Sequence, residues 1–154
     1  MKNKKEYNKR TGLEKTRASA LASLSMREHS VKELSEKLKR KEYLDDSISI
    51  VIKECLDNNY LNDERFAETY WRSRSGKGFG PNKIFHELKF KGINTELAEE
   101  TKKQDELDFD EIVQRVYEKK FKGTKIKDFK EKIKRQNYLY QRGFSRDLID
   151  VVIG

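Results

Sequence analysis

The sequence predicts an all-α protein, an elongated array of three tandem three-helix repeats. Apolar residues recur at the three- and four-residue spacing of amphipathic helices along most of the 154 residues. The chain has one proline and few of the apolar–polar alternations typical of strands. In addition, three sixteen-residue stretches align without gaps at offsets of 50 and 51 residues. A repeat of this length with three helices predicts a modular array rather than a bundle of nine unrelated helices.

The aligned stretches are KLKRKEYLDDSISIVI from Lys37, ELKFKGINTELAEETK from Glu87 and YLYQRGFSRDLIDVVI from Tyr138. Apolar residues coincide in three columns: Leu38, Leu88 and Leu139; Tyr43, Ile93 and Phe144; Ile48, Ala98 and Ile149. Repeat one has Glu42 where the other two have a glycine. We place the repeats at residues 16–60, 61–105 and 106–154, and we expect residues 1–15 to form a disordered basic tail.

The helices of repeat one are expected from Thr16, from the N-cap Ser30 and from Asp45 or Asp46. Ser30 with Glu33 three residues later is the pattern of a capping box. The expected buried positions share a helical face in each segment: Ala18, Leu21, Ala22, Leu24 and Met26; Val31, Leu34 and Leu38; Ile48, Val51, Ile52, Cys55 and Leu56.

Repeats two and three follow the same order. In repeat two, helices are expected from Asp63, Pro81 and Thr95, with these residues inward: Phe66, Ala67 and Tyr70; Ile84, Phe85 and Leu88; Leu97, Ala98 and Thr101. In repeat three, the expected inward residues are Phe109, Ile112, Val113 and Val116; Ile126, Phe129, Ile133 and Tyr140; Leu148, Ile149 and Val152.

The glycine-rich stretch SGKGFGPNK, from Ser75 to Lys83, has the composition of a phosphate-binding loop but not the pattern. A Walker loop needs Lys-Ser/Thr after its last glycine and a strand before its first, whereas here Lys77 precedes Gly78 and a helix precedes the loop. The dinucleotide fingerprint fails because Pro81 occupies the place of its third glycine. We therefore predict a hinge between two helices, and no nucleotide or other cofactor.

Charge is strongly segregated along the chain. Thirty-five Lys and Arg against 27 Asp and Glu give a net charge of +8, which favours polyanions or acidic protein surfaces as partners. The second helix of each repeat is basic, and the third helix or its surroundings is acidic. Because equivalent helices of an array align, we expect a basic strip that binds a partner or nucleic acid, against the alternative of an ordinary solvated surface. Its residues are Lys37, Lys39, Arg40, Lys83, Lys89, Lys91, Lys130, Lys134 and Arg135. Arg72 and Arg74, just before the glycine-rich stretch, are also predicted to bind the partner or nucleic acid.

Two aromatic residues are predicted to join this strip. On a helical wheel, Phe90 points away from Ile84, Phe85 and Leu88, and Tyr138 lies between lysines. An exposed aromatic side chain among lysines suits stacking on a base or anchoring in a partner. Packing against a neighbouring helix is the other interpretation of both residues.

Several classes of function are excluded. His29 and His86 lie far apart with no ligand at metal-binding spacing, and no GxSxG nucleophile motif is present. Cys55 lies in an apolar stripe, which predicts a buried, inert thiol. No apolar run reaches the roughly 20 residues of a membrane span, and no signal-peptide core is present. We expect a soluble cytoplasmic protein that is not an enzyme and has no membrane contact.

Three stretches carry a likeness to a known family: ALASLSMREHSVKELSEKL, YLNDERFAETYWRSRSGKGFGPNKIFHEL and RGFSRDLIDVV, which together span residues 18 to 152. The chain resembles RecX, the bacterial regulator of the RecA recombinase. The resemblance implies a non-enzymatic protein that binds RecA filaments on single-stranded DNA and hinders their growth, their ATPase, strand exchange and co-protease activity. It leaves the sign of regulation open, because some relatives help recombination. We expect a monomer; the alternative is a general DNA- or RNA-binding basic helical protein.

Overall fold

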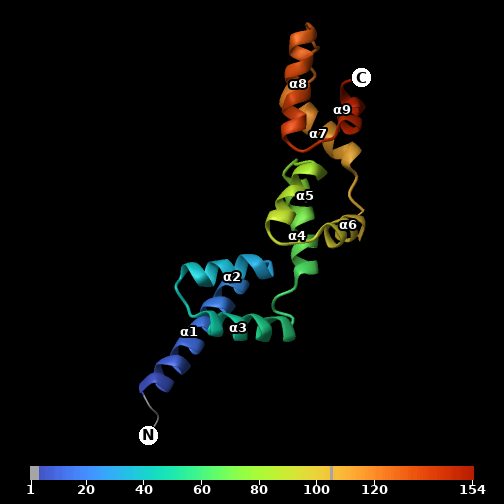
Figure 1. Ribbon diagram of the computed structural model, residues 1–154. Coiled ribbons are helices and arrows are strands. Elements are labelled where there is room, and N and C mark those ends of the chain that lie inside the picture. The colour runs from blue at the N-terminus through green and yellow to red at the C-terminus, as the bar shows by residue number, and fades with distance from the viewer. Residues whose placement is uncertain (1–3, 105) are drawn as a thin grey trace. The chain divides into compact units, whose positions relative to one another are not determined.

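The computed structural model describes residues 4–104 and 106–154. Within these residues the chain forms nine helices and no strand (Figure 1). The helices are α1 Lys4–Met26, α2 Val31–Arg40, α3 Asp45–Asp57, α4 Asp63–Gly76, α5 Pro81–Phe90, α6 Thr95–Gln104, α7 Phe109–Phe121, α8 Phe129–Gln141 and α9 Arg146–Val152. The all-α fold class with three helices per repeat is confirmed.

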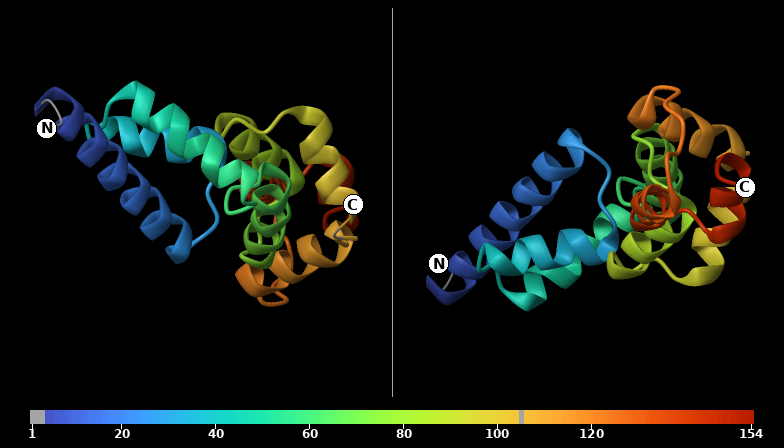
Figure 2. Two further views of the ribbon diagram at one scale, coloured as in Figure 1. Left: turned by 90° about the horizontal axis from the view of Figure 1, so that it is seen from below. Right: turned by 90° about the horizontal axis from the view of Figure 1, so that it is seen from above.

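The chain divides into two compact units, and the division falls inside α4. The first unit runs to Phe66 and includes Lys91–Ile93; the second contains Ala67–Phe90 and Asn94–Gly154. In the first unit α1, α2 and α3 pack on one another. In the second, α5 packs on α6, and α9 packs on both α7 and α8 (Figures 1 and 2).

The repeat register deduced from the sequence is confirmed by burial and by backbone conformation. Leu38, Leu88 and Leu139 are all fully buried, as expected for one structural position used three times. The turn after each second helix needs a left-handed residue. Glu42 has φ +66°, and the glycines aligned with it, Gly92 and Gly143, have φ +86° and +102°. Glu42 thus adopts the conformation that glycine adopts more cheaply in the other two repeats.

The capping box of α2 is also confirmed. The Ser30 hydroxyl accepts a hydrogen bond from the Glu33 N–H at 3.1 Å, and the Glu33 carboxylate accepts one from the Ser30 N–H at 3.2 Å. These two bonds satisfy backbone donors that have no partner within the helix. They fix the start of α2 and the direction in which Glu33 points.

The first helix corrects two predictions. Residues 4–15, predicted as a disordered tail, belong to α1, because this segment is rich in Lys and Glu, which favour helices; residues 1–3 lie outside the described residues. The predicted apolar face is also wrong, since Ala18 and Leu21 are exposed and Met26 is 84% exposed. The buried face instead contains Thr16, Ala20 and Ser23, whose small side chains let α2 and α3 approach closely.

The eighth helix is rotated relative to the prediction. The expected inward residues Phe129 and Tyr140 are 75% and 67% exposed, and Ile126 and Ile133 are also exposed. Its buried residues are Leu139 and Arg135. The apolar spacing misled because the Arg135 guanidinium finds enough hydrogen-bond partners to be buried, and so takes a position that an apolar side chain was expected to occupy.

Trp71 of α4 organises the core of the second unit. The side chain is fully buried, and its indole N–H donates to the Ala98 carbonyl at 3.0 Å. Its ring meets Phe85 and Phe109 edge to face, with ring centres 4.9 and 6.2 Å apart. One aromatic residue therefore ties α4, α5 and α6 of repeat two to the start of α7 in repeat three.

Candidate nucleic-acid and partner interface

The predicted basic residues of α2 lie where the sequence placed them. Leu34 and Leu38 are buried, and Val31 is partly buried against the same core. Lys39 and Arg40 are exposed and Lys37 is half-buried. All three are held on one rigid, capped helix, near its C-terminal end, where positive charge is favoured by the helix dipole.

In repeat two, some of the residues predicted to bind a partner are exposed, and others are held by contacts within the protein. Arg72 and Lys89 are exposed, and Phe90 is 77% exposed. Arg74, in contrast, forms a bidentate ion pair with Glu87, with N–O distances of 3.0 and 2.9 Å. Lys83 is half-buried, with its ammonium 5.0 Å from the centre of the Phe79 ring. Arg72, Lys89 and Phe90 are therefore accessible to solvent, whereas Arg74 is part of the structure of its own repeat.

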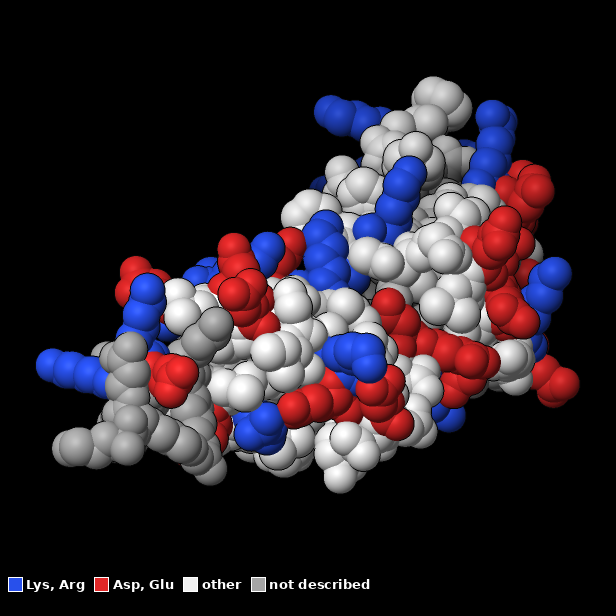
Figure 3. Space-filling view, turned by 60° about the horizontal axis from the view of Figure 1, so that its bottom comes forward, with Lys and Arg blue, Asp and Glu red and all other residues white. Residues whose placement is uncertain are grey.

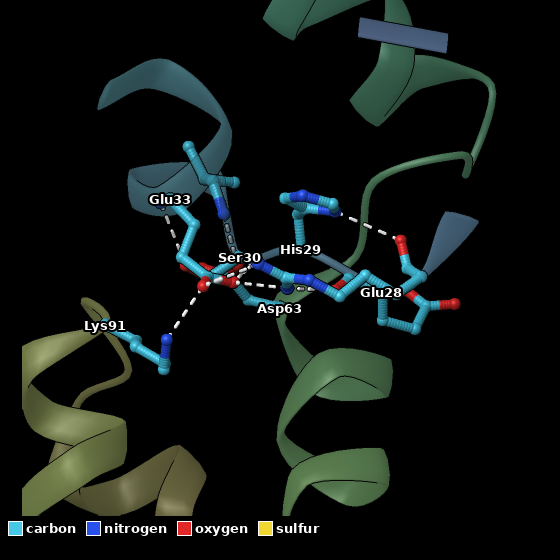
Figure 4. A network of polar contacts seen from close by, with 8 residues as sticks. Glu28, His29, Ser30, Glu33, Asp63 and Lys91 are labelled. Atoms are coloured by element: carbon cyan, nitrogen blue, oxygen red, sulfur yellow. Dashed lines mark hydrogen bonds and ion pairs between the residues drawn. The ribbon is translucent and has the colours of Figure 1, made fainter. Parts of the chain in front are cut away.

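Lys91 belongs to a polar network around the start of α2 (Figure 4). Its ammonium lies 2.7 Å from Glu33, which Arg27 also contacts at 3.2 Å. Burial of Glu33 alone would raise the pKa of its carboxyl. The hydrogen bonds from Arg27, Lys91 and Ser30 outweigh this effect and lower the pKa to about 2. Lys91 therefore stabilises the first unit through an ion pair, a role that its sequence position did not reveal.

Two more residues of the network in Figure 4 are His29, which is buried, and Asp63, which is half-buried. His29 is 2% exposed, its Nδ1 lies 3.0 Å from the Arg27 carbonyl, and burial lowers its pKa. Asp63 accepts from the Val31 N–H at 2.9 Å, so α4 begins with a side chain that also holds the start of α2. In the described part of the chain, no three His, Cys, Asp or Glu side chains gather as a metal site would require. Cys55 is buried, as predicted, and burial raises the pKa of its thiol.

Arg135 corrects the predicted strip in repeat three. The residue is 2% exposed, and its guanidinium donates to the Tyr117 hydroxyl, the Thr124 carbonyl and the Glu131 carboxylate at 2.8, 2.9 and 2.7 Å. It also lies over the Phe121 ring, 4.5 Å from the ring centre. Arg135 thus fastens the loop between α7 and α8. Lys130 and Lys134, on the same helix, are exposed as predicted.

Tyr138 is half-buried rather than exposed. Its ring meets Phe121 edge to face at 5.8 Å, and the charged ends of Lys120 and Arg142 lie 5.2 and 5.8 Å from its centre. Lys120 and Arg142 thus meet the expectation that Tyr138 lies among basic side chains. An interaction with a base would need to displace one of these cations.

The glycine-rich loop is a tight junction between repeats two and three rather than a hinge. The Gly80 N–H donates to the Arg142 carbonyl at 2.7 Å, and the Asn82 N–H donates to the Gly143 carbonyl at 3.0 Å. A Cβ at Gly80 would overlap the Gly143 backbone. The Arg74 and Arg142 guanidinium carbons lie 4.0 and 4.4 Å from the centre of the Phe79 ring. The glycines are needed because they let the backbones at Gly80 and Gly143 touch, and no local sequence pattern reveals such a contact.

Beside this junction lies a basic pocket of about 340 Å³, entirely within the second unit. We call it the junction pocket; its lining residues are Gly76, Lys77, Gly78, Arg115, Val116, Lys119, Lys120, Tyr138 and Arg142. Only Tyr138 was identified as a candidate from sequence. The lysine-rich stretch from Arg115 to Lys122 was the one sequence feature that could have indicated this pocket. Lys77 and Arg142 reach the pocket only because repeats two and three pack on each other.

Across the face drawn in Figure 3, basic side chains alternate with acidic ones. Among the helices described, none is long and apolar enough to cross a bilayer.

Comparison with known protein families matches three adjacent segments of the chain. Models of the RecX first, second and third three-helix domains match residues 17–55, 62–101 and 108–153. Regulatory protein RecX of Legionella pneumophila strain Corby is 40% identical over 134 residues, covering 87% of this chain and 89% of that protein. Regulatory protein RecX of Vibrio parahaemolyticus is 36% identical over 138 residues, covering 90% and 89%.

Solved structures show the same fold. The crystal structure of RecX from Lactobacillus salivarius superposes with a TM-score of 0.75 at 28% identity, covering 93% of this chain and 95% of that one. A second crystal structure, of regulatory protein RecX, gives a TM-score of 0.81 at 19% identity, covering 99% and 79%.

Proposed function

The chain belongs to the RecX family of regulatory proteins, and we propose that it binds RecA recombinase filaments on single-stranded DNA and hinders their growth. It acts as a monomer and without enzymatic activity. Filament binding would lower the ATPase, strand exchange and co-protease activities that depend on the filament.

One structural observation supports a filament as the partner. The last two residues of each second helix are exposed at equivalent positions, offset by 50 and 51 residues, and each pair includes a cation or an aromatic residue. These pairs are Lys39 and Arg40, Lys89 and Phe90, and Tyr140 and Gln141. A filament repeats one subunit surface along its length, so a protein made of repeats can make the same kind of contact several times. Linked contacts of this sort give high avidity from individually weak ones.

Charge supports a partner that contains both protein and nucleic acid. Exposed cations such as Lys89 and Lys130 favour contact with phosphates and make binding sensitive to salt. The acidic start of α3, where Asp45 and Asp46 are exposed, would repel a bare polyanion but can pair with basic protein side chains.

The test uses RecA filaments preassembled on single-stranded DNA and separated from free protein by sedimentation. Lys39→Glu with Lys89→Glu should weaken binding by about tenfold or more, since two phosphate or carboxylate contacts become repulsive. The control, Lys15→Glu with Lys103→Glu, makes the same charge change at exposed positions outside the second helix of any repeat and should weaken binding by less than about threefold. Equal loss in both variants would contradict the assignment of the helix ends.

The alternative function is general binding of DNA or RNA, which the net charge of +8 favours. The two are separated by measuring affinity for bare single-stranded DNA and for the filament at the same salt concentration. Tighter binding to the filament supports the regulator. Equal affinity for both supports the general nucleic-acid-binding protein.

A further inference from the structure

We propose that the junction pocket binds a phosphate group of single-stranded nucleic acid; this inference deepens the proposed function and rests on it. The pocket is lined by five cationic side chains, from Lys77, Arg115, Lys119, Lys120 and Arg142, and by no acidic residue. They come from the end of α4, from α7 and from the turn after α8, so the packing of two repeats brings them together.

The charge of these side chains is largely uncompensated by the protein. In the described part of the chain, Lys77, Lys119, Lys120 and Arg142 form no ion pair with a carboxylate, and Arg115 lies 3.8 Å from Glu111, an exposed neighbour on its own helix. Cations gathered around a concave site repel one another. An anion in the pocket relieves that repulsion, and the walls of the pocket strengthen the attraction relative to a flat surface.

The pocket is organised before any ligand arrives. The Arg142 guanidinium donates to the Gly78 carbonyl at 3.0 Å and to the Lys77 carbonyl at 2.9 Å, and it stacks on Phe79. Gly78 has φ +88°, and a Cβ there would lie 2.9 Å from Val116 and 3.1 Å from Arg142. Glycine at this position therefore allows the loop to hold Arg142 in place, which lowers the entropy lost when an anion binds.

A phosphodiester fits these groups better than other anions of the same charge. Tyr138 also lines the pocket, and its hydroxyl, which has no hydrogen-bond partner among the described residues, supplies a neutral donor. Guanidinium and ammonium groups together recognise phosphate oxygens. A flexible single strand can place one phosphate into a concave site, whereas the phosphates of a duplex are held at fixed spacing on a rigid helix. The base of a free mononucleotide should add little to binding, because cations already lie near the Tyr138 ring and leave no open surface on which a base could stack.

The experiment measures binding of a fluorescently labelled oligothymidylate by anisotropy, without RecA, over a range of salt concentrations. Lys119→Gln with Lys120→Gln should weaken binding by about tenfold or more and reduce the salt slope by about 0.7 for the one phosphate lost. Lys15→Gln with Lys103→Gln removes the same charge elsewhere and should weaken binding by less than about threefold. Gly78→Ala, which removes no charge but displaces Arg142, should also weaken binding.

Location and ligand are checked separately. Amide NMR shifts caused by the oligonucleotide should concentrate at Gly76, Gly78 and the last turns of α7. The lysine substitutions should weaken binding of a duplex of the same length less than binding of the single strand. ATP or thymidine monophosphate should compete with the oligonucleotide only at millimolar concentration. The proposal would be overturned if the pocket and control variants lost equal affinity for the oligonucleotide, or if the pocket substitutions weakened binding of single strand and duplex equally. Competition by a mononucleotide at micromolar concentration would also overturn it. Because RecA is absent, a positive result stands even if the protein fails to act on filaments.

Discussion

Phe90 and Leu88 are two residues apart on α5 and have opposite surroundings. Phe90 is 77% exposed, whereas Leu88 is fully buried. Phe90→Ala should change the free energy of unfolding by less than about 0.5 kcal/mol and weaken filament binding by about 2 kcal/mol. Leu88→Ala should cost about 2–5 kcal/mol of stability. Chemical denaturation and filament sedimentation measure the two quantities. A loss of several kcal/mol of stability in Phe90→Ala would show that the ring is a packing residue.

Glu33 predicts a pH dependence of stability. Its pKa is about 2 in the folded protein against 4.5 for an unperturbed carboxyl, so its contribution is complete above pH 4.5 and is lost as the pH falls from there through 2. The shift corresponds to about 3 kcal/mol. The Glu33→Gln variant should therefore be less stable than the wild type at pH 7, and its free energy of unfolding should change less between pH 4.5 and 2. Glu36→Gln, at an exposed position of the same helix, should show the same pH dependence of stability as the wild type. Identical acid profiles for Glu33→Gln and wild type would exclude this role.

Single residues were the least predictable level. Lys39, Lys89 and Phe90 are exposed as the helical wheel indicated, because for them the local period decides exposure. Arg135 could not be predicted, since its burial depends on Tyr117 and Thr124, which approach it only when the loop after α7 folds back. The ion pairing of Lys91 with Glu33 likewise joins residues 58 positions apart. Helical periodicity carries no information about such distant partners.

At the scale of elements, the junction of repeats two and three makes a specific prediction. Gly80→Ala should destabilise the protein by about 1–3 kcal/mol, because the new methyl group would overlap the Gly143 backbone. Gly76→Ala, four residues earlier in the chain, meets nothing within 4 Å and should be neutral or slightly stabilising, by up to about 1 kcal/mol. Thermal and denaturant unfolding measure both. Equal stability of the two variants would mean that the loop is a hinge, as its sequence alone indicates.

The predicted buried faces of the helices are confirmed where bulky apolar residues form the core, as in α7 and, apart from the exposed Leu56, in α3. They fail where the buried face is polar or made of small residues. α1 buries Thr16, Ala20 and Ser23, and α8 buries Arg135. In both helices, the face that apolar spacing predicts to be buried is the face that lies toward solvent. Phe129 and Tyr140 consequently form an exposed apolar face on α8.

At the scale of the whole molecule, the threefold repeat was the most predictable feature. The alignment of Leu38, Leu88 and Leu139 depends only on sequence, and each of these positions is fully buried. The junction pocket was not predictable, because its cations come from three separate segments of two repeats. Repetition explains how a chain with many charged residues can fold around small cores. It also explains why its exposed helix ends suit a repetitive partner.

The most direct test is the single-stranded-DNA-dependent ATPase of purified RecA with this protein titrated in. A regulator of filament growth should inhibit at a small fraction of the RecA concentration, because one bound molecule blocks addition of many subunits. Lys39→Glu with Lys89→Glu should require more protein for the same inhibition, and the Lys15→Glu with Lys103→Glu control should not. Inhibition that begins only when the protein is sufficient to cover the DNA itself would contradict filament regulation and indicate a general nucleic-acid-binding protein.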